Sequence, residues 1–196
     1  SDLGTGQIDF AEMERAVKEY KPKMIIAGYS AYPWAVDWAR FREICDMVPG
    51  GPAKLVADIS HPVGLVVAGL IPSPIGYADA ITFTTHKTLC GPRGAAVVTT
   101  DEATAKMIDI GVFPGEQGGP HLHQIAAKAV GFKLANTDEF RELQKQVQKN
   151  AIALAEAFKE KGMKVAYGGT DTHLMLVDLK AINTPSGRPL TGEIAS

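Results

Sequence analysis

The sequence predicts an α/β protein of layered architecture with a mixed sheet. Helical and strand-like segments alternate along most of the 196 residues, a pattern typical of sheets covered by helices. The apolar segments 80–86 and 94–100 are joined by too few residues for a crossover helix. At least this pair of strands is therefore expected to be antiparallel, within a sheet whose other strands can be parallel.

The first elements are a helix, a strand and a second helix. Asp9 and Glu12 form a capping-box pattern ahead of apolar residues at helical spacing, and segment 23–30 then has strand character. Asp37 can cap the next helix, which the sequence PGGP at 49–52 ends. The buried face of that helix is expected to hold Trp38, Phe41, Cys45 and Val48.

A second strand, 54–60, contains Asp58 near its end, and the strands 80–86 and 94–100 follow it. Beyond Pro120 the pattern becomes helical. Asn136-Thr137 breaks the pattern after a first helix and is expected to cap a long second one, which ends before Gly162. One face of the first helix is expected to hold Leu122, Ile125, Ala126, Ala129 and Val130. The core-facing stripe of the second helix is expected to hold Phe140, Leu143, Val147, Ala151, Leu154 and Phe158. Segments 163–167 and 173–180 return to strand character.

Lys87 is the residue on which the functional interpretation depends. It follows the strand 80–86 in the sequence ITFTTHKTLCGPRGAAVV, among hydroxyls, an imidazole and loop backbone. An amine in such surroundings suits a lysine that forms a Schiff base with an aldehyde cofactor. Taken alone, however, a lysine at a strand end is more often simply solvated.

Asp58 supplies a chemically complementary group at another strand end. If the strands carrying Asp58 and Lys87 are parallel, both residues lie at the same edge of the sheet, where ligands of doubly wound folds bind. Pyridoxal phosphate needs this pairing, because the lysine holds the aldehyde carbon while an acid keeps the pyridine nitrogen protonated. The alternative for Asp58 is a turn or helix cap.

Several motifs, in order along the chain, resemble those of serine hydroxymethyltransferases. They are GYSAYP at 28–33, ADISHPVGL around Asp58, HKTLCGPRG around Lys87, FPGEQGGPHLHQIAAKAV at 113–130 and GGTDTHLMLVDL at 168–179. The resemblance spans nearly the whole chain. It implies the aspartate-aminotransferase-like fold, also called fold type I, of pyridoxal-phosphate enzymes.

The resemblance also implies roles for individual residues. Lys87 is expected to hold the cofactor and Asp58 to pair with its pyridinium nitrogen, with Thr84 beside the lysine. Ser30 and His61 are placed near the cofactor's phenolic oxygen and the substrate carboxylate, and His86 near the phosphate. Less specific alternatives are a strand cap for Ser30 and a loop-filling role for His61.

Gly118 and Gly119 resemble a backbone loop that reaches the cofactor phosphate of a neighbouring subunit, which fits the use of bare N–H groups to bind an anion. The site then requires a homodimer or a dimer of dimers. An ordinary turn before the helix starting near His121 is the alternative. His121 and His123 have no further ligand at metal-site spacing, so no metal site is expected.

The resemblance divides the chain into three parts. Residues 1–136 correspond to part of the large pyridoxal-phosphate-binding domain, 137–162 to a connecting helix and 163–196 to the start of the small C-terminal domain. Members of the family are longer, so we expect this chain to be a central fragment that is inactive by itself.

For the parent enzyme, the resemblance implies pyridoxal-phosphate-dependent, reversible transfer of the serine hydroxymethyl group to tetrahydrofolate, giving glycine and methylene-tetrahydrofolate. Serine or glycine and folate are then the small-molecule ligands. Two alternatives remain open. One is another aldol-cleaving pyridoxal enzyme, of the threonine aldolase or alpha-methylserine type, and the other is a non-catalytic folding or dimerisation module around segment 115–135.

Composition is that of a cytoplasmic globular protein, with 45% hydrophobic and 21% charged residues and a net charge of −2. This charge gives no reason to expect nucleic acid as a partner. The longest apolar run, 63–71, is too short to span a bilayer, so no membrane association is expected. Cys45 and Cys90 are expected to be free thiols in a reducing compartment.

Overall fold

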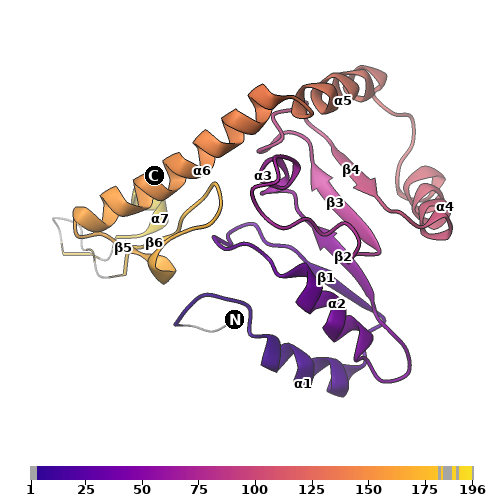
Figure 1. Ribbon diagram of the computed structural model, residues 1–196, viewed down its shortest axis with the longest axis horizontal. Coiled ribbons are helices and arrows are strands. Elements are labelled where there is room, and N and C mark those ends of the chain that lie inside the picture. The colour runs from indigo at the N-terminus through magenta and orange to yellow at the C-terminus, as the bar shows by residue number, and fades with distance from the viewer. Residues whose placement is uncertain (1–3, 181, 183–186, 189, 196) are drawn as a thin grey trace.

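The computed structural model describes residues 4–180, 182, 187–188 and 190–195. Helices and strands alternate in the N-terminal half, and helices dominate the C-terminal half (Figure 1). The N-terminal half comprises α1 (Phe10–Tyr20), β1 (Met24–Ala27), α2 (Trp38–Asp46), β2 (Lys54–Asp58), α3 (Val63–Val67), β3 (Ala80–Thr84) and β4 (Ala95–Val98). The C-terminal half comprises α4 (Glu102–Ile110), a π-helical turn (Gly111–Glu116), α5 (Leu122–Ala135), α6 (Asp138–Glu160), β5 (Lys164–Val165), a 3₁₀ turn (Ala166–Gly168), β6 (Val177–Asp178) and α7 (Gly192–Ala195).

Four strands form one mixed sheet in the order β1-β2-β3-β4. The first three run parallel, and β4 returns antiparallel to β3. Asp58 at the end of β2 is in register with Thr82 of β3. The predicted α/β class and mixed sheet are confirmed, and the carboxyl ends of β2 and β3 share one edge of the sheet, as the placement of Asp58 and Lys87 requires.

Side chains cap four helices as the local sequence dictates. Asp9 Oδ1 accepts a hydrogen bond from Glu12 N–H (2.9 Å) at α1, and Asp37 Oδ1 accepts from Arg40 N–H (3.0 Å) at α2. Asp101 caps α4, where its Oδ2 accepts a hydrogen bond from Thr104 N–H (2.8 Å). Thr137 caps α6, where its Oγ1 accepts from Phe140 N–H (3.2 Å). The caps of α1, α2 and α6 were predicted, whereas α4 was not.

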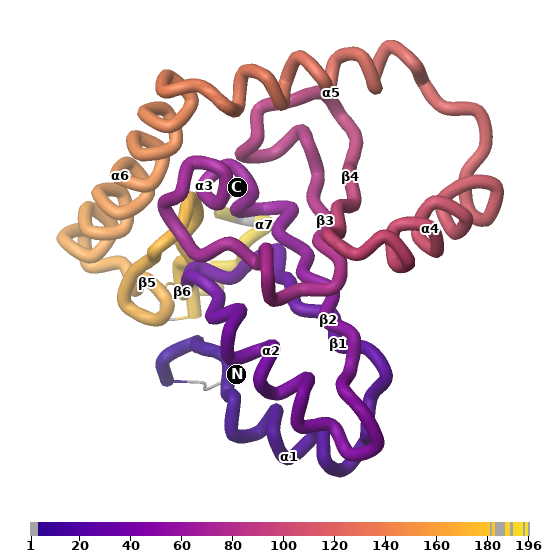
Figure 2. Tube along the Cα trace, turned by 45° about the vertical axis from the view of Figure 1, so that its right-hand side comes forward, coloured from indigo at the N-terminus to yellow at the C-terminus, as the bar shows by residue number. Residues whose placement is uncertain are grey.

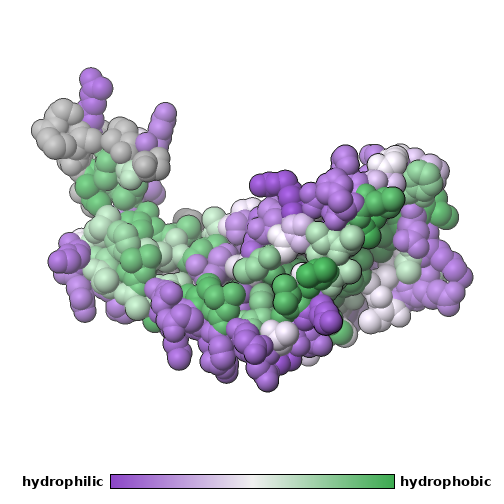
Figure 3. Space-filling view, turned by 90° about the horizontal axis from the view of Figure 1, so that it is seen from above, coloured by the Kyte–Doolittle hydropathy of each residue, from purple (hydrophilic) through white to green (hydrophobic). Residues whose placement is uncertain are grey.

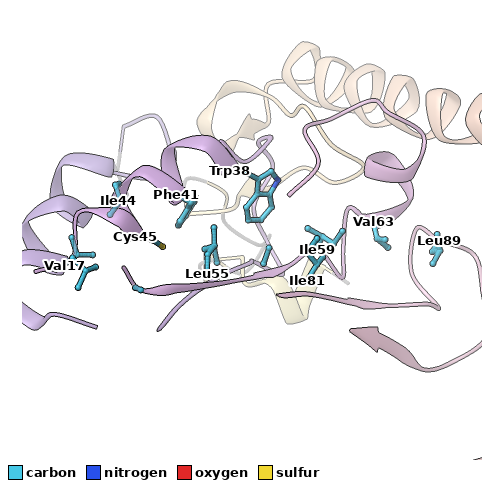
Figure 4. Close-up of a cluster of buried hydrophobic side chains, with 14 of the residues drawn as sticks. Val17, Trp38, Phe41, Ile44, Cys45, Leu55, Ile59, Val63, Ile81 and Leu89 are labelled. Atoms are coloured by element: carbon cyan, nitrogen blue, oxygen red, sulfur yellow. The ribbon is translucent and has the colours of Figure 1, made fainter. Parts of the chain in front are cut away.

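The core lies between the sheet and the helices α1 and α2. Figure 4 shows its side chains gathered between α2 and the strands. Phe41 and Leu55 are fully buried, and Phe10 packs edge-on against Phe41 with ring centroids 5.5 Å apart. Trp38, Phe41 and Cys45 confirm the predicted buried face of α2, whereas Val48 is buried two residues beyond the end of the helix. Met24 and Ile26 of β1 are 53% and 71% exposed, so the apolar side chains of this strand are covered unevenly.

The apolar face of α5 is exposed, and the predicted core stripe of α6 is fully buried only at Phe140 and Ala151. Helices α5 and α6 follow one another around the outside of the sheet (Figure 2). The surface on the side of these helices shows hydrophobic residues among polar ones (Figure 3). Leu143 and Leu154 of α6 are 47% and 51% exposed, which corrects the predicted core stripe. The buried residues of α6 are Phe140, Gln144, Ala151 and Ala155. Leu122 of α5 is 70% exposed.

After α6 the chain forms the two-stranded antiparallel pair β5-β6, much shorter than the two strand segments predicted. The loop between them bonds back to the N-terminal half, where Thr170 Oγ1 donates to Pro33 O (3.0 Å). The division at 136 and 162 stays a prediction. Part of the predicted small domain, 163–196, lies outside the described residues, namely 181, 183–186, 189 and 196.

In the part of the chain that the structure describes, no helix combines the length and apolar character needed to cross a membrane.

Candidate active site

The candidate site lies where β2 and β3 end. Asp58 is the last residue of β2, and the chain leaving β3 passes through Thr85 and His86 to Lys87. Both Asp58 and Lys87 interact electrostatically with the ring of His61, which follows β2. The fold therefore brings together the three residues on which the predicted chemistry depends.

Electrostatics at His61 reflects this arrangement. Burial lowers the pKa of the His61 ring, and the positive charge of Lys87 lowers it further, whereas the negative charge of Asp58 acts in the opposite direction. The lowered pKa favours the neutral imidazole of His61 at pH 7. This imidazole can accept or donate one hydrogen bond without bringing a charge into the site.

Local structure fixes Asp58 at the strand end. Its Oδ1 accepts a hydrogen bond from Ser60 N–H at 2.8 Å, which turns the chain sharply after β2. Gly28, just beyond β1, packs so closely that a Cβ on it would lie 2.6 Å from the Asp58 Cβ. A glycine is needed here because any side chain would displace the carboxylate-bearing backbone.

The segment that carries Lys87 is a tight turn tied to itself. Gly91 N–H donates to Thr85 O (2.7 Å), Thr85 N–H to Gly94 O (2.9 Å) and Cys90 N–H to Lys87 O (3.0 Å). Thr85, 1% exposed, also donates from Oγ1 to Pro92 O at 2.5 Å. This network holds the backbone of Lys87 in place while its side chain stays partly exposed.

Thr88 joins this turn to the neighbouring parts of the site, and the sequence interpretation did not single it out. Its Oγ1 donates to His61 O (2.6 Å) and accepts from Gly64 N–H (2.9 Å), so it links the lysine turn to the start of α3. Its carbonyl accepts from Gln144 Nε2 of α6 at 2.8 Å. The sequence shows a threonine directly after the lysine, but it does not show which groups that threonine bonds, because those groups are distant in the sequence.

The predicted residues Thr84 and His86 both precede Lys87, Thr84 as the last residue of β3 and His86 directly before the lysine. Thr84 N–H donates to Ser60 Oγ, and Thr84 Oγ1 donates to Ser60 O, both at 3.2 Å. His86 Nδ1 lies 3.3 Å from both the N–H and the carbonyl oxygen of Gly94, and its tautomer decides which of the two it bonds. Both side chains are therefore positioned by the backbone that flanks Lys87.

Ser30, Gly118 and Gly119 are placed differently. Ser30 is exposed two residues after Gly28, beyond the end of β1. Gly118 and Gly119 are exposed and line a separate hollow that includes Arg93. A Cβ on either of these two glycines would meet no atom within 4 Å. Within this one chain, the glycine pair does not line the hollow of Asp58, and its assignment to a neighbouring subunit stays a prediction.

An apolar and aromatic hollow adjoins Asp58 and His61, and its residues include Tyr29, Tyr32, Trp34, Trp38 and His173. Tyr29 and Tyr32 lie with ring centroids 5.1 Å apart, and burial raises the pKa of both hydroxyls. His173 stacks on His61 with ring centroids 5.8 Å apart. The sequence contained His173 within a matching motif, but no local pattern indicated that it meets His61.

The described residues contain no group of three or more His, Cys, Asp or Glu side chains arranged to bind a metal ion.

Comparison with known proteins accords with this geometry. The family model described as Serine hydroxymethyltransferase matches residues 2–189. The chain belongs to the serine hydroxymethyltransferase family. Two relatives in this family, both named serine hydroxymethyltransferase, come from Psychrobacter sp. (strain PRwf-1) and Psychrobacter cryohalolentis. They are 53% identical over 175 residues and 52% identical over 176 residues, covering 89% and 90% of this chain. The chain spans 41% of the length of each relative.

Proposed function

We propose that this chain binds pyridoxal phosphate through Lys87 and contributes the cofactor site of a serine hydroxymethyltransferase. The reaction proposed is the reversible transfer of the serine hydroxymethyl group to tetrahydrofolate, which gives glycine and methylene-tetrahydrofolate. The observation that carries the proposal is the convergence of Lys87 and Asp58 on His61 at neighbouring strand ends. Membership of the family supports the same reaction.

The residues at the crevice fit pyridoxal phosphate. Lys87 offers a primary amine that is partly exposed, and Asp58 offers an exposed carboxylate, so a ligand can reach both. The neutral ring of His61 offers a flat surface for an aromatic ligand. When bound, the cofactor supplies an electron-withdrawing ring that accepts negative charge from the α-carbon of an amino acid.

Each residue has a defined task in the proposed site. Lys87 holds the cofactor aldehyde and gives it up to the incoming amino group. Asp58 keeps a proton on the ring nitrogen of the ligand, because a carboxylate stabilises the adjacent positive charge. Thr84 lies beside the lysine segment, where its hydroxyl, held by Ser60, can orient the amine during this exchange.

Three further assignments concern the periphery of the cofactor. We place Ser30 and His61 near its phenolic oxygen and the substrate carboxylate, and His86 near its phosphate. Gly118 and Gly119 would present bare backbone N–H groups to the phosphate bound by a neighbouring subunit. Their exposure and the open space around them leave room for such a contact.

A homodimer, or a dimer of dimers, completes this proposal. Large apolar side chains are exposed on α4, the following turn and α5, and include Met107 (65%), Ile110 (68%), Phe113 (62%), Leu122 (70%) and Leu134 (60%). Exposed apolar side chains of this size are candidates for protein–protein contacts. Light scattering of the chain with pyridoxal phosphate present should give at least twice the monomer mass at micromolar concentration. A monomer mass would contradict the dimer.

Cytoplasmic location is part of the same proposal. Cys45 is buried and Cys90 exposed, and both are free thiols. Free cysteines are usual in reducing compartments.

The cofactor proposal can be tested by titrating the chain with pyridoxal phosphate and recording the visible absorbance of a lysine adduct. Lys87→Ala should abolish the saturable change. Lys145→Ala is the matched control, because Lys145 lies on α6 in an exposed ion pair with Glu142, and it should leave the titration unchanged. Equal titrations for the wild type and Lys87→Ala would contradict the proposal.

The alternative functions are separated by product analysis of the parent enzyme with the cofactor present. Glycine formation from serine that strictly requires tetrahydrofolate supports the hydroxymethyltransferase reaction. Folate-independent cleavage of hydroxy amino acids, with no folate-dependent turnover of serine, supports a threonine aldolase or alpha-methylserine type. A folded dimer that takes up no pyridoxal phosphate supports a non-catalytic folding or dimerisation module.

A further inference from the structure

His173 belongs to the site although it is far from Asp58 and His61 in the sequence. Its ring stacks on that of His61, with centroids 5.8 Å apart and an interplanar angle of 20°. Both rings line the aromatic hollow beside Asp58. His173 is therefore in direct contact with a residue assigned to the cofactor site.

The loop that carries His173 is anchored to the segment around Pro33 and to helix α6. Asp171 N–H donates to Pro33 O (2.8 Å), and Asp171 O accepts from Gln148 Nε2 of α6 (2.7 Å). Thr172, 2% exposed, donates its N–H to Thr170 Oγ1 at 2.9 Å. These bonds fix the backbone next to His173, so its ring meets His61 in a defined orientation.

His173 is uncharged and has an unusual polar environment. Burial, followed by the proximity of His61, lowers its pKa to about 4. Its Nδ1 is buried and has no hydrogen-bond partner among the described residues. A buried polar atom without a partner costs free energy that a phenylalanine at the same place would not. The flat ring of His173, and not a hydrogen bond from its Nδ1, is therefore what this residue presents to His61.

We propose that His173 is a positioning residue that fixes the ring plane of His61 and keeps that ring uncharged at neutral pH. The inference rests on the proposed cofactor function, which assigns His61 to the surroundings of the cofactor and substrate. Stacking excludes water from one face of His61, and an imidazolium stacked against a second imidazole loses hydration without gaining a counter-charge. The titratable groups around His61 are Asp58 at the end of β2, Lys87 after β3, Tyr29 and Tyr32 after β1, and His173.

The experiment is an NMR pH titration of the His61 ring in the wild-type chain and in two variants, without pyridoxal phosphate. His173→Ala removes the stacked ring and should raise the proton affinity of His61 about 3- to 10-fold, because water then reaches the imidazolium. His173→Phe keeps a flat ring over His61 and should stay within about 2-fold of the wild type. If His173→Ala does not fold, His173→Gln, which has no ring to stack, replaces it.

Pyridoxal phosphate affinity, measured separately in each variant, distinguishes the two proposals. We expect His173→Ala to weaken cofactor binding and His173→Phe to restore most of it. An unchanged His61 titration in His173→Ala, in a chain that binds pyridoxal phosphate through Lys87, would overturn the positioning role alone. A His61 titration that shifts as expected, in a chain that never binds the cofactor, supports the coupling of the two histidines and overturns the proposed function.

Discussion

Gly64→Ala should damage the lysine turn directly, because Gly64 lies against the backbone next to Lys87. A Cβ at Gly64 would lie 2.7 Å from the carbonyl carbon of Thr88 and 2.8 Å from Gln144 Oε1. Ordinary contacts between carbon atoms begin at ~3.5 Å, so the Thr88 backbone must move by roughly 1 Å. Gln144 is 1% exposed and donates from Nε2 to Thr88 O at 2.8 Å, which leaves little room for this movement.

The expected cost of this substitution is about 1–3 kcal/mol of unfolding free energy, the usual range for an overpacked core. Urea denaturation measures it. Since Thr88 holds both His61 and Gly64 through its hydroxyl, the displacement should also weaken pyridoxal phosphate binding at Lys87.

Gly111→Ala is the matched control. Gly111 has helical backbone angles (φ −64°, ψ −38°), and a methyl group added to its Cα would meet no atom within 4 Å. Alanine there should be neutral or stabilise by about 0.4–1 kcal/mol, because it restricts the unfolded chain. If Gly64→Ala and Gly111→Ala unfold at the same urea concentration, the close contact between α3 and the lysine turn is refuted.

Acid should destabilise the chain partly through His173. The pKa of His173 is lowered to about 4 in the folded state, whereas an unfolded histidine titrates at ~6.5. Between these pH values the unfolded chain binds a proton that the folded chain does not. Stability therefore falls as the pH falls. Partial exposure reduces the effect to about 1–2 kcal/mol, and urea midpoints at pH 7 and pH 4 should show a smaller loss in His173→Gln than in the wild type. Phe41→Ala should lose about 3–5 kcal/mol in the same assay, because Phe41 is 1% exposed in the core. Leu143→Ala, at a side chain 47% exposed, should lose less than about 1 kcal/mol, and a loss as large as that of Phe41→Ala would restore the core position predicted from the sequence.

Local signals predicted the elements that local physics determines. Asp9, Asp37 and Thr137 cap helices where the sequence indicates, because a cap depends on residues three positions away. The starts and the parallel pairing of β2 and β3 were also predictable, and with them the shared edge for Asp58 and Lys87, although both strands end two residues before the predicted 60 and 86. The short link to β4 indicated the antiparallel pair.

The error on α6 arose because helical periodicity does not say what covers a face. Leu143 and Leu154 recur at core spacing in α6, yet the helix turns Phe140, Gln144, Ala151 and Ala155 inward and leaves both leucines exposed. The short helix α3 was missed because its apolar run, 63–67, has no periodicity to distinguish helix from strand. His173 and Gln144 reach the site only through tertiary contacts.

The most direct test of the central claim is to add pyridoxal phosphate to the chain, reduce with borohydride and locate the added mass by peptide mapping. The account predicts one labelled residue, Lys87, and no label at that peptide in Lys87→Ala. Asp58→Asn, which removes the charge but keeps the shape, should weaken cofactor binding without moving the label. Label spread over exposed lysines such as Lys145, with none enriched at Lys87, would contradict the assignment of this crevice as the cofactor site.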